Sequence, residues 1–192
     1  MMKIILASKS PRRKELLETL FKDFECIPST KEEKTNKKLN YKKTAEVLSE
    51  QKAEDIFSQT FGDRLVIGSD TMVVLHNRIY GKPKDKKEAF YMLKALSGKT
   101  HIVVTGLCLI TEENGIKQKI STSVVSKVTF KKLSDDEINS YIESGEPMDK
   151  AGSYGCQGMG KKFIKKINGD FFAVMGLPVN KIYEICKNLS II

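Results

Sequence analysis

Apolar side chains at the start of the chain predict a strand followed by a helix. Residues 3–7 form a short apolar run that stops at Ser8, and large apolar side chains then recur on one helical face up to Phe21. Ser10 is a favoured N-cap residue, and Pro11 fits the first helical position, where its missing N–H is not needed. We therefore expect a strand, a loop and a helix that starts at Ser10.

Further along the chain, apolar positions recur at helical spacing in some segments and are continuous or alternate in others. The predicted helices cover residues 44–57, 85–98, 134–144 and 178–189. The predicted strands cover residues 65–75, 78–80, 101–110, 116–130, 163–167 and 171–175. Residues 28–43 are polar and lysine-rich, which is typical of a loop, and glycines interrupt residues 152–160.

This mixture of hairpins and interspersed helices predicts an α/β fold with a mixed β-sheet. A length of 192 residues is enough for one sizeable core, so we expect a single domain over residues 1–192. The chain has neither the GxGxxG pattern of a Rossmann fold nor a P-loop lysine motif. These two common classes of nucleotide-binding fold are therefore disfavoured.

Composition is that of an ordinary globular chain, with 40% hydrophobic and 30% charged residues. No signal peptide is visible, and no apolar run approaches the roughly 20 residues that a membrane-spanning helix needs. The four cysteines are scattered and form no CxxC pair, which favours reduced thiols. We expect a cytoplasmic protein without a membrane partner.

The formal net charge of +9 favours an anionic partner, which can be a nucleic acid, a membrane surface or a phosphorylated small molecule. The chain shows no recognisable nucleic-acid-binding motif and no aromatic stacking stripe, so nucleic acid is the less favoured partner. Solvated surface lysines account for most of the excess charge in this interpretation.

Residues 8–13 combine chemistry that suits a phosphate group. The hydroxyls of Ser8 and Ser10, the N–H groups of a helix start, and the side chains of Arg12 and Arg13 converge at a strand-to-helix junction. The alternative is an ordinary capped helix with exposed arginines.

Asp70 lies inside the apolar strand predicted over residues 65–75. A buried and unpaired carboxylate costs several kcal/mol, so Asp70 needs a metal, a cation or backbone donors as partner. A functional acid is one interpretation, and a bulge satisfied by local backbone hydrogen bonds is the other.

Two lysines gain importance only if the fold brings them towards Arg12 and Asp70. Lys52 and Lys82 are each unremarkable as surface lysines. Gln157 lies in the glycine-rich segment and offers both a donor and an acceptor that could recognise the edge of a base. A flexible connection is the alternative for that segment.

These segments together closely resemble the Maf family of nucleotide pyrophosphatases. The matching blocks, in order, are residues 7–17, 51–53, 68–74, 81–83, 96–101, 149–158 and 176–178. The resemblance implies an elongated α/β domain with a strongly twisted mixed sheet, flanking helices and a central cleft, akin to the inosine triphosphate pyrophosphatases. It also implies a hydrolase acting on acid anhydrides, which cleaves a nucleoside triphosphate to the monophosphate and pyrophosphate.

The resemblance assigns roles to individual residues. Asp70 would act as general base and would share a divalent metal, Mg²⁺ or Mn²⁺, with Glu33. Glu32 is the alternative to Glu33 as metal ligand, because residues 29–32, which precede Glu33, depart from the acidic pattern usual in the family. The residues that would hold the triphosphate are Ser8, Ser10, Arg12, Arg13, Lys52 and Lys82.

Arg12, Thr71 and Gln157 match the subgroup of this family that cleaves dTTP and UTP, with modified pyrimidine nucleotides as further candidates. The similar 7-methyl-GTP subgroup would carry glutamate at position 157. Family members are often homodimers, so we expect a homodimer here. A basic protein that binds nucleic acid or regulates cell division is the rival from another functional class.

Overall fold

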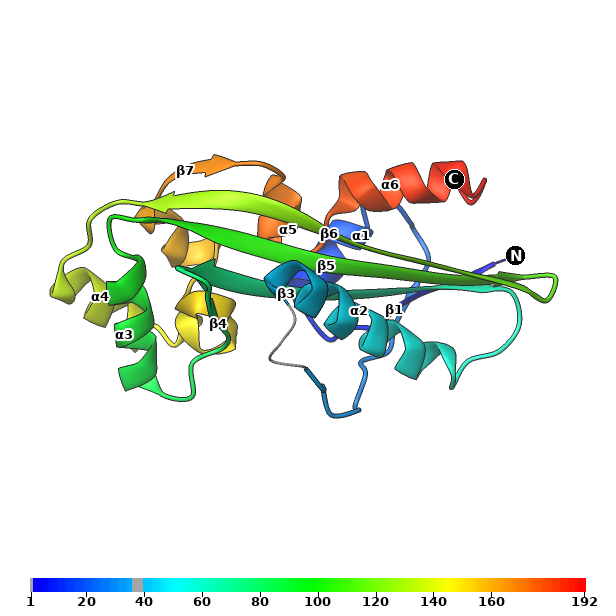
Figure 1. The fold of residues 1–192 in the computed structure, drawn as a ribbon, viewed down its shortest axis with the longest axis horizontal. Helices are drawn as coiled ribbons and strands as arrows, with labels where there is room; N and C mark the ends of the chain where they lie inside the picture. Colours follow the sequence, from blue (N-terminus) through cyan, green and yellow to red (C-terminus); the bar gives the residue numbers. More distant parts are fainter. Residues whose placement is uncertain (1, 36–39) are drawn as a thin grey trace. The chain divides into compact units, whose positions relative to one another are not determined.

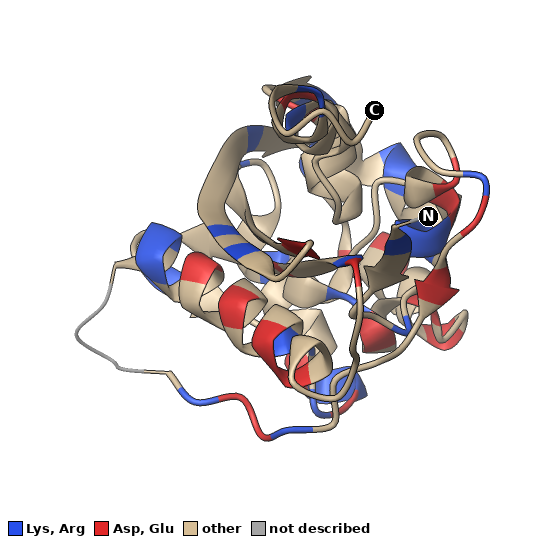
Figure 2. Cartoon of the chain, turned by 90° about the vertical axis from the view of Figure 1, so that its right-hand side faces the viewer, with Lys and Arg blue, Asp and Glu red and all other residues tan. Residues whose placement is uncertain are grey.

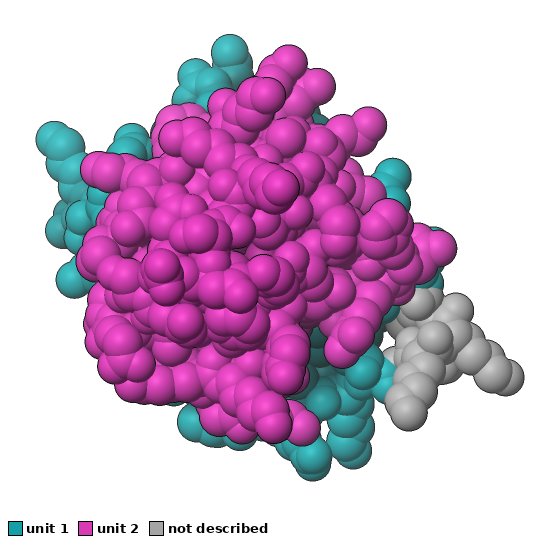
Figure 3. All heavy atoms as spheres, turned by 90° about the vertical axis from the view of Figure 1, so that its left-hand side faces the viewer, with its two compact units in different colours: residues 1–70, 105–124, 176–192 teal, residues 71–104, 125–175 magenta. Residues whose placement is uncertain are grey.

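The computed structural model describes residues 2–35 and 40–192, and Figure 1 labels its helices and strands. The chain forms two compact units, which Figure 3 colours teal and magenta. Unit 1 comprises residues 1–70, 105–124 and 176–192, and unit 2 comprises residues 71–104 and 125–175. Neither unit is continuous in sequence, because the chain passes from one to the other several times.

Unit 1 contains strands that pair in parallel. Its complete elements are β1 (Lys3–Leu6), α1 (Pro11–Leu17), β2 (Glu25–Cys26), α2 (Tyr41–Phe57) and α6 (Val179–Asn188). The long strands β3 (Arg64–Leu75), β5 (Thr100–Glu113) and β6 (Ile116–Phe130) contribute residues to both units. Strand β1 pairs in parallel with β2 and with β3.

Unit 2 adds antiparallel pairing and several short elements. They are β4 (Arg78–Tyr80), α3 (Lys86–Leu96), α4 (Asp135–Glu143), β7 (Ile164–Asn168), α5 (Phe171–Met175) and 3₁₀ turns over Glu146–Asp149, Ala151–Ser153 and Gly158–Phe163. Strands β4 and β7 pair antiparallel with β3 and β6. The strand order in the described residues is β2-β1-β3-β5-β6-β7. The predicted α/β fold with a mixed sheet flanked by helices is confirmed.

Two glycines let α2 lie directly on the strands of unit 1. A Cβ atom at Gly68 of β3 would lie 2.3 Å from the carbonyl oxygen of Ser49 and 2.8 Å from the backbone nitrogen of Ala53. A Cβ atom at Gly106 of β5 would lie 2.0 Å from the carbonyl oxygen of Ala45. Backbone atoms cannot move aside as a side-chain tip can, so both positions require glycine.

Helix α2 begins earlier than its apolar periodicity predicts. The helix starts at Tyr41 and not at residue 44, because the side chain of Asn40 accepts a hydrogen bond from the backbone N–H of Lys43 at 2.9 Å. The capping residue and the first turn are polar, so apolar spacing alone misses them. The predicted loop 28–43 is therefore shorter, and its residues 36–39 lie outside the described residues.

Some of the lysines that give the chain its positive net charge form ion pairs on the exposed side of α2. Figure 2 shows acidic turns of this helix beside basic positions on a strand, and Lys119 of β6 lies 2.9 Å from Glu54 and 3.8 Å from Glu50. Within α2, Lys43 pairs with Glu46 at 3.3 Å. Exposed pairs of this kind contribute about 0–1 kcal/mol each. These ion pairs therefore add little to the stability of unit 1.

The apolar run 171–175 is a helix and not the predicted strand. The side chain of Asp170 accepts a hydrogen bond from the backbone N–H of Ala173 at 3.0 Å, and its carbonyl accepts one from Val174 at 3.2 Å. Phe171 is 44% exposed whereas Ala173 is buried. A short apolar run does not distinguish a strand from a single helical turn, and the capping aspartate decides between them.

The first predicted helix is also shorter than expected. Helix α1 ends at Leu17, and the chain continues in turns, so Leu20 and Phe21 lie beyond the helix. Its start is as predicted, with Ser10 at the N-cap and Pro11 at the first position, although the Ser10 hydroxyl makes no capping hydrogen bond.

All four cysteines are free thiols, in agreement with the prediction. Burial raises the pKa of Cys108 to about 12, so this thiol is un-ionised at neutral pH. In the part of the chain that is described, no helix combines the length and the apolar character needed to cross a bilayer.

The core of unit 2 surrounds a buried histidine. His101 is 2% exposed, its Nε2 atom lies 2.7 Å from the hydroxyl of Tyr154, and its ring meets Phe130 edge to face at 5.0 Å between centroids. Burial lowers the pKa of His101 to about 4, because the charged form would lose its hydration. His101 is therefore a neutral core residue at physiological pH.

We predict that His101 makes unit 2 less stable in acid. The unfolded histidine titrates near 6.5 and the folded one near 4, so only the unfolded chain binds the proton as the pH falls through this window. The free energy of unfolding should decrease by about 3 kcal/mol from this residue between pH 7 and pH 4. Urea unfolding of the wild type and His101→Gln at several pH values measures the effect; equal pH dependence in both proteins would contradict it.

We also predict that Gly68→Ala destabilises unit 1. The added methyl group would collide with the backbone of α2, and overpacking of this kind costs about 1–3 kcal/mol. The matched control is Gly81→Ala, where the added Cβ atom meets nothing within 4 Å and where stability should hardly change. The measurement is the urea midpoint of each variant, and an unaltered midpoint for Gly68→Ala would show that the helix can shift freely.

Candidate active site

Residues 7–10 connect strand β1 to helix α1 through a tight turn. The backbone N–H of Ser8 donates to the carbonyl of Leu6 at 2.8 Å, and the backbone N–H of Ser10 donates to the Ser8 hydroxyl at 3.1 Å. The buried Ser8 side chain is therefore part of the turn. This arrangement brings the two predicted hydroxyl residues together at the end of β1.

Arg13 connects three segments of unit 1. Its Nε atom donates to the carbonyl oxygen of Gly176 at 2.8 Å, and its Nη1 atom donates to that of Ser69 at 2.8 Å and to the Ser8 hydroxyl at 3.4 Å. Desolvation lowers the pKa of Arg13, while the negative charge of Asp70 acts in the opposite direction. The guanidinium group therefore fixes α1 against β3 and against the segment that leads into α6, in addition to any role toward a ligand.

Asp70 has a cationic partner, as its position in an apolar strand requires. The ammonium group of Lys52 on α2 forms a short ion pair with Oδ1 of Asp70, and it also lies 3.0 Å from Oε1 of Glu33. The side chains of Lys52 and Asp70 are 16% and 15% exposed, whereas Glu33 is 47% exposed. One lysine therefore gathers the two carboxylates that the resemblance assigns to a metal.

The alternative acid, Glu32, lies outside this group. It is exposed, and its carboxylate has no ion pair or hydrogen bond within residues 2–35 and 40–192. The loop thus directs Glu33, and not its neighbour, toward Lys52 and Asp70.

Two side chains of α2 hold the loop that carries Glu33. The amide group of Gln51 accepts a hydrogen bond from the backbone N–H of Lys34 at 2.9 Å and donates to its carbonyl oxygen at 2.6 Å. On the other side of Glu33, Asp55 accepts hydrogen bonds from the Ser29 hydroxyl at 2.8 Å and from the backbone N–H of Thr30 at 3.2 Å. The loop is therefore attached to the helix both before and after Glu33.

Asp55 is 1% exposed and belongs to this arrangement rather than to the surface. Burial raises the pKa of Asp55, but hydrogen bonds from Ser29, Lys31 and Thr30 outweigh that effect and hold it below the usual value. The sequence patterns do not indicate Gln51 or Asp55 as site residues. The sequence does contain one indication for Asp55. It is an acidic residue between Ala53 and Ile56, on the side of the predicted helix that is expected to be buried.

Arg12 is half-buried on α1 in unit 1, and the three remaining predicted residues belong to unit 2. Thr71 follows Asp70 on β3, Lys82 is exposed just after β4, and Gln157 is partly buried in the glycine-rich segment. The backbone N–H of Gly152 donates to the carbonyl of Gly81 at 3.0 Å, which attaches the glycine-rich segment to the chain beside Lys82.

Gly152 also explains part of the glycine pattern in this segment. It has a φ angle of +66°, and a Cβ atom there would lie 2.8 Å from a methyl carbon of Val73. The segment therefore begins with a close approach of Gly152 to β3 within unit 2.

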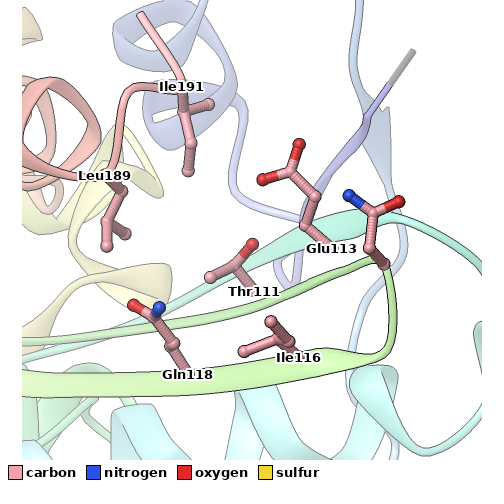
Figure 4. A pocket seen from close by; sticks show the side chains of 7 residues that line it. Thr111, Glu113, Ile116, Gln118, Leu189 and Ile191 are labelled. Carbon is pink, nitrogen blue, oxygen red and sulfur yellow. The ribbon is translucent and has the colours of Figure 1, made fainter.

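A small pocket lies elsewhere in unit 1, at the tip of the β5–β6 hairpin and the end of the chain (Figure 4). Its volume is about 160 Å³, and its lining residues are Thr111, Glu113, Asn114, Ile116, Gln118, Leu189 and Ile191. Ligand pockets for molecules of nucleotide size commonly measure about 300–1,000 Å³. The pocket contains none of the predicted site residues and is too small for such a ligand.

Comparison with known proteins identifies the family. The family model described as "Maf-like protein" matches residues 3–189, so the chain belongs to the Maf-like proteins.

Curated relatives from several bacteria align over almost the whole chain. A protein of Alkaliphilus oremlandii is 50% identical over 98% of this chain and 96% of its own length, and one of Aquifex aeolicus is 46% identical over 100% and 97%. One of Clostridium novyi is 44% identical over 99% of both chains. All three carry the name dTTP/UTP pyrophosphatase.

Among solved structures, a HAM1 protein from Coxiella burnetii is 20% identical and has a TM-score of 0.44 over 68% of this chain and 73% of that chain.

We predict that Asp55→Ala loosens the loop around Glu33. The substitution leaves the Ser29 hydroxyl and the Thr30 N–H without their buried acceptor, and the free energy of unfolding should decrease by about 3 kcal/mol. Hydrogen exchange at the amides of Thr30 and Lys34 should become faster.

The control for this variant is Asp23→Ala, because Asp23 is an exposed aspartate of the same unit. Its effect should stay within about 0.5 kcal/mol. If Asp55→Ala has an effect as small as that of the control, then Asp55 does not hold the loop.

Proposed function

We propose that this chain is a nucleoside triphosphate pyrophosphatase that converts dTTP and UTP to the monophosphate and pyrophosphate. The curated relatives carry this activity in their names and align over nearly their full length at 44–50% identity. The observation on this chain that best supports the proposal is the group formed by Lys52, Asp70 and Glu33. It combines a candidate base, a second acid and a cation in unit 1.

In this proposal Asp70 is the general base. Its carboxylate takes a proton from a water molecule while the water oxygen forms a bond to the α-phosphorus. The bond between the α-phosphorus and the bridging oxygen to the β-phosphate breaks, and pyrophosphate leaves with the electron pair. Lys52 orients Asp70 before the reaction, because its ammonium group forms an ion pair with the Asp70 carboxylate.

Glu33 and Asp70 are the residues that would hold a divalent metal ion. No group of three or more potential ligand side chains occurs among the described residues. Two carboxylates fit Mg²⁺ or Mn²⁺ nevertheless, because Mg²⁺ is commonly bound by one or two carboxylates together with substrate phosphates and water. When bound, the ion would supply positive charge at the phosphate oxygens, where negative charge develops.

The proposed triphosphate ligands are Ser8, Ser10, Arg12, Arg13, Lys52 and Lys82. Arginine forks and lysine ammonium groups are the side chains that bind phosphate oxygens most strongly. Arg13 would serve mainly by holding the backbone around Ser69 and Gly176, given its hydrogen bonds to both carbonyls.

Arg12, Thr71 and Gln157 are the proposed determinants of base preference, as in the dTTP/UTP subgroup. Glutamine at position 157 favours this subgroup over the 7-methyl-GTP subgroup. We further propose a single domain over residues 1–192 that acts as a cytoplasmic homodimer without membrane or nucleic-acid partners.

We predict that Asp70→Asn abolishes turnover and preserves folding. Asparagine has nearly the same shape but cannot accept the proton from water, and loss of a general base typically lowers kcat by about 10²–10⁴-fold. Pyrophosphate release from a panel of nucleoside triphosphates, with magnesium or manganese, measures the activity, and circular dichroism reports folding.

The matched control is Asp23→Asn, which should retain wild-type rates for every nucleotide. A wild type that releases pyrophosphate from no nucleotide would refute the proposed function. Near-normal turnover by Asp70→Asn would instead remove only Asp70 from its role as base.

A further inference from the structure

A buried tyrosine and a glutamate in unit 2 hold the segment that carries Gln157. Tyr141 lies on α4, which ends at Glu143, and Glu146 is the first residue of the 3₁₀ turn Glu146–Asp149 that follows. The hydroxyl of Tyr141 donates to Oε1 of Glu146 at 2.9 Å. Both side chains precede the glycine-rich segment in sequence, and neither belongs to the residues proposed above for the reaction.

The Glu146 carboxylate accepts hydrogen bonds from backbone N–H groups just after Gln157. The N–H of Met159 donates to Oε2 at 2.8 Å, and the N–H of Gly160 donates to Oε1 at 3.3 Å. Burial raises the pKa of Glu146, but hydrogen bonds from Met159, Tyr141 and Gly160 outweigh it and hold the pKa below its usual value. An ionised carboxylate is an acceptor only, so it matches this set of donors.

Tyr141 attaches the segment on the other side of Gln157. Its hydroxyl oxygen accepts a hydrogen bond from the backbone N–H of Gly155 at 3.4 Å. The backbone is therefore held two residues before Gln157 by the tyrosine and two residues after it by the glutamate. Gln157 is the middle of a short span whose two ends are fixed by one pair of side chains.

Two glycines in the segment are explained by this pair. A Cβ atom at Gly158 would lie 2.7 Å from Oε2 of Glu146, and one at Gly160 would lie 2.7 Å from the hydroxyl of Tyr141. Gly158 also has a φ angle of +65°, which glycine adopts without strain. The glycines thus permit the backbone to close around the Tyr141–Glu146 pair.

We propose that Glu146 and Tyr141 are positioning residues for base selectivity, and that they act by fixing the backbone on both sides of Gln157. The proposal rests on the function proposed above, in which Gln157 recognises the base. A glutamine on an unrestrained loop could offer its donor and acceptor to any base edge. A glutamine on a fixed backbone presents them in one arrangement and discriminates between bases.

Glu146→Gln and Tyr141→Phe test the proposal. Glutamine retains an acceptor of the same shape but loses the charge, and phenylalanine retains the ring and loses the hydroxyl. In both variants the preference for dTTP and UTP over CTP and GTP, expressed as kcat/KM, should decrease by about tenfold, mainly through KM. Saturating turnover of dTTP should change less than its KM.

Two controls distinguish positioning from general damage. Glu143→Gln alters an exposed glutamate of the same helix, paired with Lys86 at 2.8 Å, and should leave selectivity unchanged. In a Gln157→Ala background, Glu146→Gln should have no further effect on selectivity, because it acts through Gln157.

A lower melting temperature with unchanged selectivity in both variants would overturn the proposal and leave the pair a purely structural role. An equal loss of selectivity in the Gln157→Ala background would also overturn it. Calorimetry measures the affinities for the monophosphates TMP, UMP, CMP and GMP. The ratio of these affinities reports the preference for thymine and uracil over cytosine and guanine without any turnover. A wild type that hydrolyses nothing would therefore refute the proposed function, while the ratio of affinities would still decide the present proposal.

Discussion

The close approach of helix α2 to strand β3 is the constraint on which the rest of unit 1 depends. At Gly68 the two backbones leave no room for a Cβ atom, so the helix lies directly on the strand. Lys52 is one residue from Ala53, which forms this contact, and Asp70 is two residues from Gly68. The contact therefore brings the ammonium group to the carboxylate, which Asp70 requires because it sits in an otherwise apolar strand.

The same helix organises the neighbouring loop. Gln51 and Asp55 lie on either side of Lys52 and bind the backbone before and after Glu33, so three polar residues of α2 act on one short stretch of chain. The second acid is thereby held near the first, although it lies on an irregular segment. Binding groups on loops need such support from a rigid element if they are to keep their geometry.

Unit 2 uses a comparable device with different chemistry. There the support comes from Tyr141 and Glu146, and the supported segment carries Gln157. In both units a polar side chain on or next to a helix satisfies backbone groups of a loop, and a residue with candidate chemistry lies between the attachment points. Buried backbone donors and acceptors need hydrogen-bond partners in any fold. Side chains that hold the two loops through these groups therefore leave no additional polar group unsatisfied.

The amino-acid sequence by itself determined most element types, the mixed α/β class and the residues with candidate chemistry, because periodicity, caps and turn residues act locally. Local patterns failed at Tyr41 and over residues 171–175, where a capping side chain and not apolar spacing decided the outcome. Only the tertiary structure decided that Glu33 rather than Glu32 meets Lys52, that Arg13 binds backbone carbonyls, and that Gln51, Asp55 and Glu146 hold loops. These facts depend on contacts between residues far apart in sequence, which no local pattern encodes.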